Sequence, residues 1–126
     1  MARSGWNPPA GLHGTALVVI EDDRAALATT LVLQEMGMTV DIAADRNAAL
    51  EWIEDAGYSL IVCSGEDQDA TTNFVLRVRY LSRRSRIVLL ANAGYILDGL
   101  EILGIEVLQG PMDVNRLISR VLPAAA

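Results

Sequence analysis

The chain has 126 residues, a net charge of −6 at pH 7 and 52% hydrophobic residues. This length suits one domain with a single core, and the high aliphatic content excludes a disordered chain. All ten basic residues are arginines, which excludes any mechanism that needs a lysine, and the acidic balance argues against nucleic-acid binding. The surplus of aliphatic residues predicts an exposed apolar patch that contacts a partner or a second copy.

The apolar segments are too short to cross a membrane. The run from Ala16 to Ile20 ends at once in three acidic residues, and no leader peptide is recognisable at the N-terminus. The single cysteine, Cys63, cannot form an internal disulfide and lies in an apolar segment, which is typical of a buried thiol in a reducing compartment. We therefore expect a cytoplasmic protein without membrane contact.

Strand and helix patterns alternate along the chain. Residues 1–14 are rich in glycine and proline and predict a flexible N-terminal arm, followed by one domain over 15–123 and a tail over 124–126. Short apolar runs predict five strands, at 16–20, 39–43, 58–63, 86–91 and 105–108. Helical periodicity predicts helices over 24–36 and 45–56, around 74–81 and 96–103, and over 114–122. Five strand and helix pairs with short connections predict a three-layer α/β sandwich around a parallel sheet.

Acidic residues follow several of these strands. One of Asp22 and Asp23, then Asp45, and then Asp69 are expected to cap the first three helices, where a carboxylate is favoured by the exposed amide groups and by the helix dipole. The strand over 58–63 runs into Ser64 and an acidic loop, and the carboxyl ends of parallel strands are where a functional crevice forms. Ser64 therefore lies where chemistry is expected.

Several local patterns resemble one known family. They are the acidic cluster in Leu17-Val-Val-Ile-Glu21-Asp22-Asp23, the Gly37-Met-Thr-Val40 segment, the Ala44–Leu50 segment and the Gly110-Pro111 turn. Together they are similar to the receiver domain of two-component response regulators, over roughly residues 16–122. The resemblance implies a flavodoxin-like, CheY-like sheet of order 2-1-3-4-5. It also implies a cis peptide at Gly110-Pro111.

In that family, a magnesium-dependent transfer places a phosphoryl group on an aspartate after the third strand, and each part of this machinery has a corresponding position here. Glu21 and Asp22 match the two metal-holding acids. The remaining positions do not carry the required side chains: the acceptor falls on Ser64, the hydroxyl on Ala91, the switching aromatic on Val107 and the lysine on Gly110.

These losses predict a degenerate or pseudo-receiver domain that is not an enzyme and needs no cofactor. The cluster of Glu21, Asp22 and Asp23 is more simply explained by its place at the start of the first helix, where Asp22 or Asp23 acts as the cap and the dipole favours carboxylates, than by metal binding. Weak, vestigial magnesium binding at Glu21 and Asp22 is compatible with the sequence. Ser64 lacks a base, because the only histidine, His13, lies in the arm. Two alternatives stay open: an unusual acceptor at Glu66 or Asp67, or regulation by a small ligand. A flavin phosphate is excluded because carboxylates occupy the loop that would bind it.

A receiver that has lost its phosphorylation site can still bind other proteins. The resemblance implies a contact surface on the fourth helix, fifth strand and fifth helix, with Leu97, Leu100, Glu101 and Val107 as candidate contacts. The expected partner is a signalling protein or a second copy of the chain. The arginines over 77–86 are interpreted as a solvated helix face rather than a nucleic-acid site.

Overall fold

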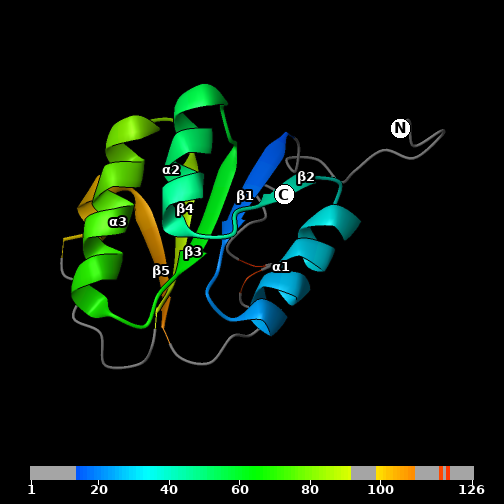
Figure 1. Cartoon of the computed structure of the whole chain (residues 1–126), viewed down its shortest axis with the longest axis horizontal. Helices are drawn as coiled ribbons and strands as arrows, with labels where there is room; N and C mark the ends of the chain where they lie inside the picture. Colours follow the sequence, from blue (N-terminus) through cyan, green and yellow to red (C-terminus); the bar gives the residue numbers. More distant parts are fainter. Residues whose placement is uncertain (1–13, 92–98, 110–116, 118, 120–126) are drawn as a thin grey trace.

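The computed structural model describes residues 14–91, 99–109, 117 and 119 (Figure 1). The elements are β1 (Thr15–Val19), α1 (Asp23–Glu35), β2 (Thr39–Ile42), α2 (Arg46–Asp55), β3 (Leu60–Ser64), α3 (Gln68–Leu81), β4 (Arg86–Ala91), the 3-10 helix η1 (Glu101–Leu103) and β5 (Ile105–Gln109). The expectations for the N-terminal arm, for most of the fourth and last helices and for the Gly110-Pro111 peptide lie outside the described residues.

The five strands form one parallel sheet in the order β2-β1-β3-β4-β5, as predicted. β1 lies between β2 and β3, whereas β2 is an edge strand with three exposed residues of four. In the pairing of β3 with β4, Leu60 lies opposite Arg86 and Ser64 lies opposite Leu90. All strands therefore end on one edge of the sheet, where their loops meet.

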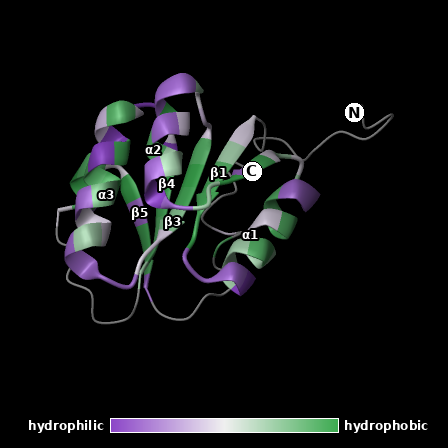
Figure 2. Ribbon diagram, viewed as in Figure 1, coloured by the Kyte–Doolittle hydropathy of each residue, from purple (hydrophilic) through white to green (hydrophobic). Residues whose placement is uncertain are grey.

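Alternate residues of each central strand enter two separate hydrophobic clusters. Leu17 and Ile61 pack in the cluster that contains residues of α2 and α3, whereas Val18 and Val62 pack in the cluster that contains residues of α1. The helices thus cover opposite faces of the sheet (Figure 1), and the central strand β3 is hydrophobic along most of its length (Figure 2). Burial on both faces explains why these strands read as continuous apolar runs.

Three aspartates cap the three α-helices that the structure describes, at the edge of the sheet where the strands end. The side chains of Asp22, Asp45 and Asp67 accept hydrogen bonds from the amides of Ala25, Ala48 and Ala70. The expectations for the first two helices are correct, but the third is wrong, because α3 begins at Gln68 and places Asp69 inside its first turn. Asp69 lies in the turn where a carboxylate is still favoured by the helix dipole.

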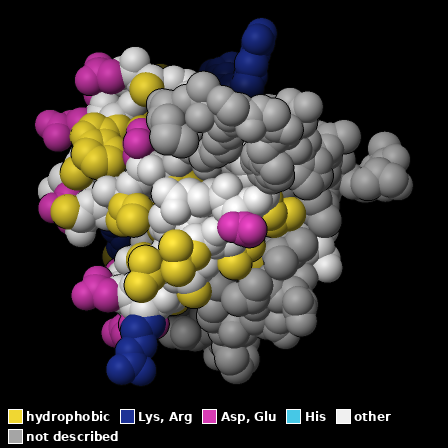
Figure 3. Space-filling model, turned by 90° about the vertical axis from the view of Figure 1, so that its right-hand side faces the viewer, with side chains coloured by type: hydrophobic (Ala, Val, Ile, Leu, Met, Phe, Trp, Pro, Cys, Tyr) yellow, Lys and Arg dark blue, Asp and Glu magenta, His cyan; other side chains and the backbone are white. Residues whose placement is uncertain are grey.

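Several large apolar side chains remain exposed, as the composition predicts. Leu27 and Leu31 of α1 and Ile42 of β2 are about half exposed, and hydrophobic side chains gather on this face between acidic ones (Figure 3). The helices that the structure describes are all too short or too polar to span a bilayer.

Candidate functional site

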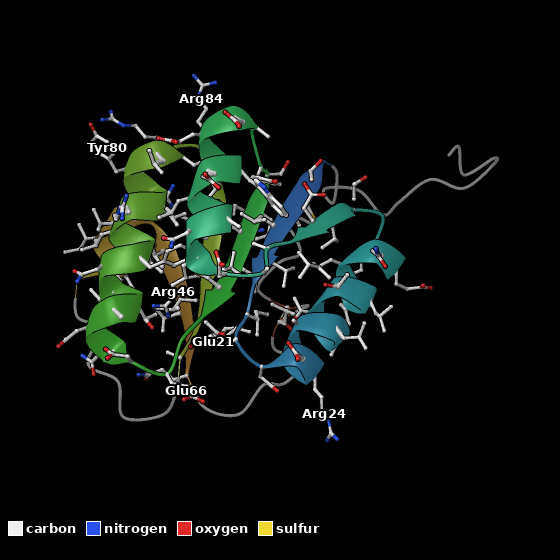
Figure 4. All side chains as sticks on the ribbon, in the orientation of Figure 1. Glu21, Arg24, Arg46, Glu66, Tyr80 and Arg84 are labelled. Carbon is white, nitrogen blue, oxygen red and sulfur yellow. The ribbon has the colours of Figure 1, made fainter. Side chains whose placement is uncertain are left out.

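The predicted site residues meet where the strands end. Glu21 follows β1, Ser64 ends β3 and Ala91 ends β4, with Ala91 paired to Gln109 of β5. Glu21, Arg46 and Glu66 lie at this same end of the sheet, whereas Tyr80 and Arg84 lie at the opposite end (Figure 4). Gly110 is outside the described residues.

Ser64 is held by contacts to the strand and helix on either side. Its Oγ accepts a hydrogen bond from the amide of Glu21 at 3.2 Å, and its carbonyl oxygen accepts one from Nη2 of Arg46 at 3.4 Å. The hydroxyl therefore links β3 to the loop after β1. These contacts provide no general base, which a serine nucleophile requires.

The two candidate metal-binding acids are already engaged. Oε1 of Glu21 accepts a hydrogen bond from the amide of Glu66 at 2.8 Å, and Oδ2 of Asp22 accepts the capping bond from Ala25 at 3.3 Å. Asp22 thus caps α1, as one of the two predicted alternatives, whereas Glu21 joins the loop after β1 to the loop after β3.

Arg46 places a positive charge beside these groups. Its Nη2 donates to Oγ1 of Thr71 at 2.9 Å and lies 3.9 Å from Oε1 of Glu21, and its Cζ is 5.4 Å from the centre of the Phe74 ring. The Arg46 side chain is 27% exposed and that of Glu21 is 56% exposed, so this ion pair contributes at most about 1 kcal/mol. The guanidinium is held mainly by its hydrogen bonds and by the aromatic ring.

Gly65 makes room for this arrangement. A Cβ atom on Gly65 would lie 1.9 Å from Nη2 of Arg46 and 2.0 Å from Oγ1 of Thr71. Glycine fits here because two polar side chains from α2 and α3 approach the backbone closely, and a larger residue would have to displace them.

A groove of about 500 Å³ opens beside Ser64. Apolar residues and polar or charged residues line it together: Val19, Ile20, Glu21, Ala43, Ala44, Asp45, Arg46, Asn47 and Ser64. It is the space that a small ligand would enter.

Comparisons by sequence find no relative: no protein-family model matches the chain, and no curated protein matches it. Solved structures do match. A response regulator from Thermotoga maritima has a TM-score of 0.70 at 20% identity, covering 86% of this chain and 94% of the other. The chemotaxis protein CheY4 of Vibrio cholerae has a TM-score of 0.68 at 21% identity, covering 87% and 99%.

This chain has the CheY-like receiver fold. A further receiver domain with this fold, from a sensor histidine kinase of Pseudomonas aeruginosa, has a magnesium ion coordinated in its active site cleft. It has a TM-score of 0.58 at 19% identity and covers 85% of this chain and 93% of the other.

The residues of this receiver fold do not fit a firmly held magnesium ion. Mg²⁺ prefers octahedral oxygen ligands, including one or two carboxylates. Here Asp22 caps α1, and Glu21 binds the Glu66 amide while facing a guanidinium. Within the described residues, no three acidic, histidine or cysteine side chains gather as a metal-binding group. Weak magnesium binding at Glu21 and Asp22 remains a prediction.

The structure corrects one residue of the predicted contact surface. Leu100 is only 3% exposed and belongs to the core, because η1 turns its side chain toward β5 and the sheet. Val107 is partly buried against the same cluster, and Leu97 lies outside the described residues. Ile102 is 89% exposed and Leu103 is 42% exposed, so these are the apolar side chains that this segment offers to a partner.

Sequence reasoning missed Arg46, Gly65 and Thr71. One signal was present, since Gly65 directly follows a strand end, where glycine often marks a close approach of other atoms. Among the arginines over 77–86, Arg77, Arg83 and Arg84 are exposed as expected, but Arg79 and Arg86 are partly buried and engaged in contacts. Arg79 binds backbone carbonyls, and Arg86 pairs with Glu106 at 2.7 Å.

Replacing Gly65 by alanine should lower the free energy of unfolding by about 1–3 kcal/mol, because the new Cβ displaces both Arg46 and Thr71. Urea denaturation measures this change. The matched control is Gly57→Ala, where nothing lies within 4 Å of the new Cβ, so stability should stay the same or rise by up to about 1 kcal/mol. Equal effects of the two substitutions would show that Gly65 is not a packing requirement.

Proposed function

We propose that the chain is a pseudo-receiver: a receiver-fold module that acts in signalling by binding proteins, without phosphorylation of its own. The observation that carries the proposal is Ser64, which ends β3 with a hydroxyl where a receiver needs an acceptor carboxylate, and which accepts the Glu21 amide. A serine in this position cannot form the acyl phosphate on which receiver switching depends.

The charges around Ser64 support the same proposal. Arg46 lies beside Glu21 and competes with a metal ion for that carboxylate. Ala91 contributes a buried methyl group where a hydroxyl would meet the phosphoryl oxygens, and the sequence contains no lysine to neutralise them. The alternative acceptor Asp67 uses its side chain to cap α3.

A binding role requires an accessible surface, and η1 provides one. Glu101, Ile102 and Leu103 are exposed, and the backbone of this turn is closed by the bond from Gly104 to Glu101. We propose that this η1 surface, defined by these three residues, contacts a signalling partner. The proposal includes the absence of catalysis and a cytoplasmic location, in keeping with the single, fully buried thiol of Cys63.

Amide NMR spectra recorded with magnesium, and then with magnesium and beryllofluoride, test this proposal. We expect magnesium to move only a few peaks near Glu21 and Asp22, and beryllofluoride to add nothing, because no carboxylate stands at position 64. In an Arg46→Ala variant, magnesium binding should tighten by about two- to fivefold, since a competing exposed ion pair is lost.

The opposite result is easily recognised. Slow-exchange shifts on adding beryllofluoride, spreading from the loop after β3 to β5, would reveal an acceptor such as Glu66 or Asp67. The same titration of the separate variants Glu66→Gln and Asp67→Asn would then show which of the two is the acceptor. The pseudo-receiver proposal would be wrong in that case.

A further inference from the structure

A second groove lies between α2 and α3, away from Ser64. Its volume is about 640 Å³, and its lining residues are Asn47, Leu50, Glu51, Glu54, Leu76, Arg77, Tyr80 and Leu81. Leu76 is 39% exposed and Tyr80 is 74% exposed, although both belong to a helix that packs on the sheet. The groove therefore presents an apolar strip to solvent, and Tyr80 lies at its far end from the site (Figure 4).

Opposite charges flank this strip. Glu51 and Glu54 lie on the α2 side and Arg77 lies on the α3 side, and all three are exposed. Within the part of the chain that the structure describes, none of the three forms an ion pair, since the ion pairs found there join Arg46 to Glu21 and Arg86 to Glu106. The groove thus has an acidic wall and a basic wall whose charges are not paired with each other.

This distribution of charge is complementary to itself. α2 and α3 each return from the carboxyl end of one parallel strand to the start of the next, so they run in the same direction. A two-fold axis parallel to the groove would place α2 of each copy over α3 of the other. The glutamates of each copy would then face Arg77 of the other copy. An axis across the groove would instead place the glutamates of one copy over those of the other. The charges therefore favour the two-fold axis that is parallel to the groove.

We propose that the α2–α3 groove is the interface of a homodimer with its two-fold axis along the groove. Leu76 and Tyr80 of the two copies form the apolar centre, and Arg77 of each copy pairs with Glu51 and Glu54 of the other. Tyrosine and arginine are the residue types that most often dominate such interfaces. The proposal goes beyond the pseudo-receiver function and does not depend on it, because neither Ser64 nor the η1 surface takes part.

Sedimentation velocity of the full chain over a wide concentration range tests the proposal. The mass should rise from 13.6 kDa toward twice that value, and salt should weaken the association because it screens the ion pairs. Arg77→Glu, and separately Glu51→Arg with Glu54→Arg, should each raise the dissociation constant by at least about tenfold, because like charges then face each other. Tyr80→Ala should weaken association as well.

Mixing the two charge variants gives the decisive result. In the mixed pair, Glu51 and Glu54 of the Arg77→Glu variant face Arg77 of the double variant. The glutamate introduced by Arg77→Glu faces the two arginines introduced on α2 of the other chain. Opposite charges therefore meet at both contacts, and a heterodimer should form although neither variant forms a homodimer. All these positions are exposed, and far-UV circular dichroism confirms that each variant is folded. The control Ile102→Asp on the η1 surface should leave dimerisation unchanged.

Three results would overturn the proposal. A wild-type chain that stays monomeric at the highest concentration has no such interface. A dimer that both charge variants retain uses another surface, and a dimer that Ile102→Asp abolishes uses the η1 surface. Failure of any of these tests leaves the pseudo-receiver proposal untouched, because that one is tested by magnesium and beryllofluoride.

Discussion

The thiol of Cys63 should by itself lower the free energy of unfolding by up to about 4 kcal/mol between pH 9 and pH 12. Cys63 is completely buried in β3, where its Sγ contacts the carbonyl oxygen of Val88 at 3.8 Å. Burial raises the pKa of this thiol from 9.0 to about 12, and the nearby Arg46 guanidinium opposes the shift. The folded chain therefore resists forming the thiolate, whereas the unfolded chain does not.

The sign of the pH dependence follows from these pKa values. Below pH 9 the thiol is protonated in both states, and its contribution to stability is fully present. Above pH 9 the unfolded chain loses the proton first, so stability declines by about 1.4 kcal/mol per pH unit until the folded pKa is reached. Urea denaturation at a series of pH values measures the slope.

Two variants separate the groups that titrate in this range. Cys63→Ala should be less stable at neutral pH, because a core side chain is truncated, but its stability should depend less steeply on pH. Burial and the hydrogen bond to Asp41 raise the pKa of Tyr58 from 10.0 to about 12, so Tyr58→Phe should flatten only the part of the curve above pH 10. An unchanged slope in Cys63→Ala would contradict the assignment to the thiol.

Replacing Arg79 by alanine should lower the free energy of unfolding by about 2–3 kcal/mol. Its Nη1 donates to the carbonyl oxygens of Ser82, Arg83 and Ser85 at 3.0–3.1 Å, and its Nη2 donates to that of Gly104 at 3.3 Å. One guanidinium thus joins the turn after α3 to the turn before β5. Hydrogen bonds to a charged donor are stronger than neutral ones, and alanine would leave the more buried of these carbonyls without a donor.

Thermal or urea unfolding measures this loss, and the same basic cluster supplies the control. Arg84 is exposed, and its side chain forms no hydrogen bond or ion pair with a described residue, so Arg84→Ala should change stability by less than about 0.5 kcal/mol. Arg79→Lys should recover only part of the loss, because an ammonium group cannot reproduce the planar fork of a guanidinium. Equal decreases in the free energy of unfolding for Arg79→Ala and Arg84→Ala would show that the hydrogen bonds of Arg79 do not stabilise the fold.

Local patterns were sufficient for the architecture. Apolar runs located all five strands, 3.6-residue periodicity located the helices that the structure describes, and acidic residues before α1 and α2 identified their caps. Ser64 was also found this way, because a strand that ends in a polar loop is visible in the sequence. These features depend on residues a few positions apart, which composition and periodicity report directly.

Contacts between distant segments required the fold. The amide of Glu21 meets Ser64 across 43 positions, and Nη2 of Arg46 meets Thr71 across 25. Leu100 is a candidate contact residue by sequence but is buried, and Arg79 lies among surface arginines but binds the backbone of two separate turns. In each case the side chain's neighbours are set by strand order and register, which bring together elements that no local pattern connects. The sequence of residues determines the order of the elements along the chain. The contacts between polar and charged side chains of distant elements are determined only by the assembled sheet.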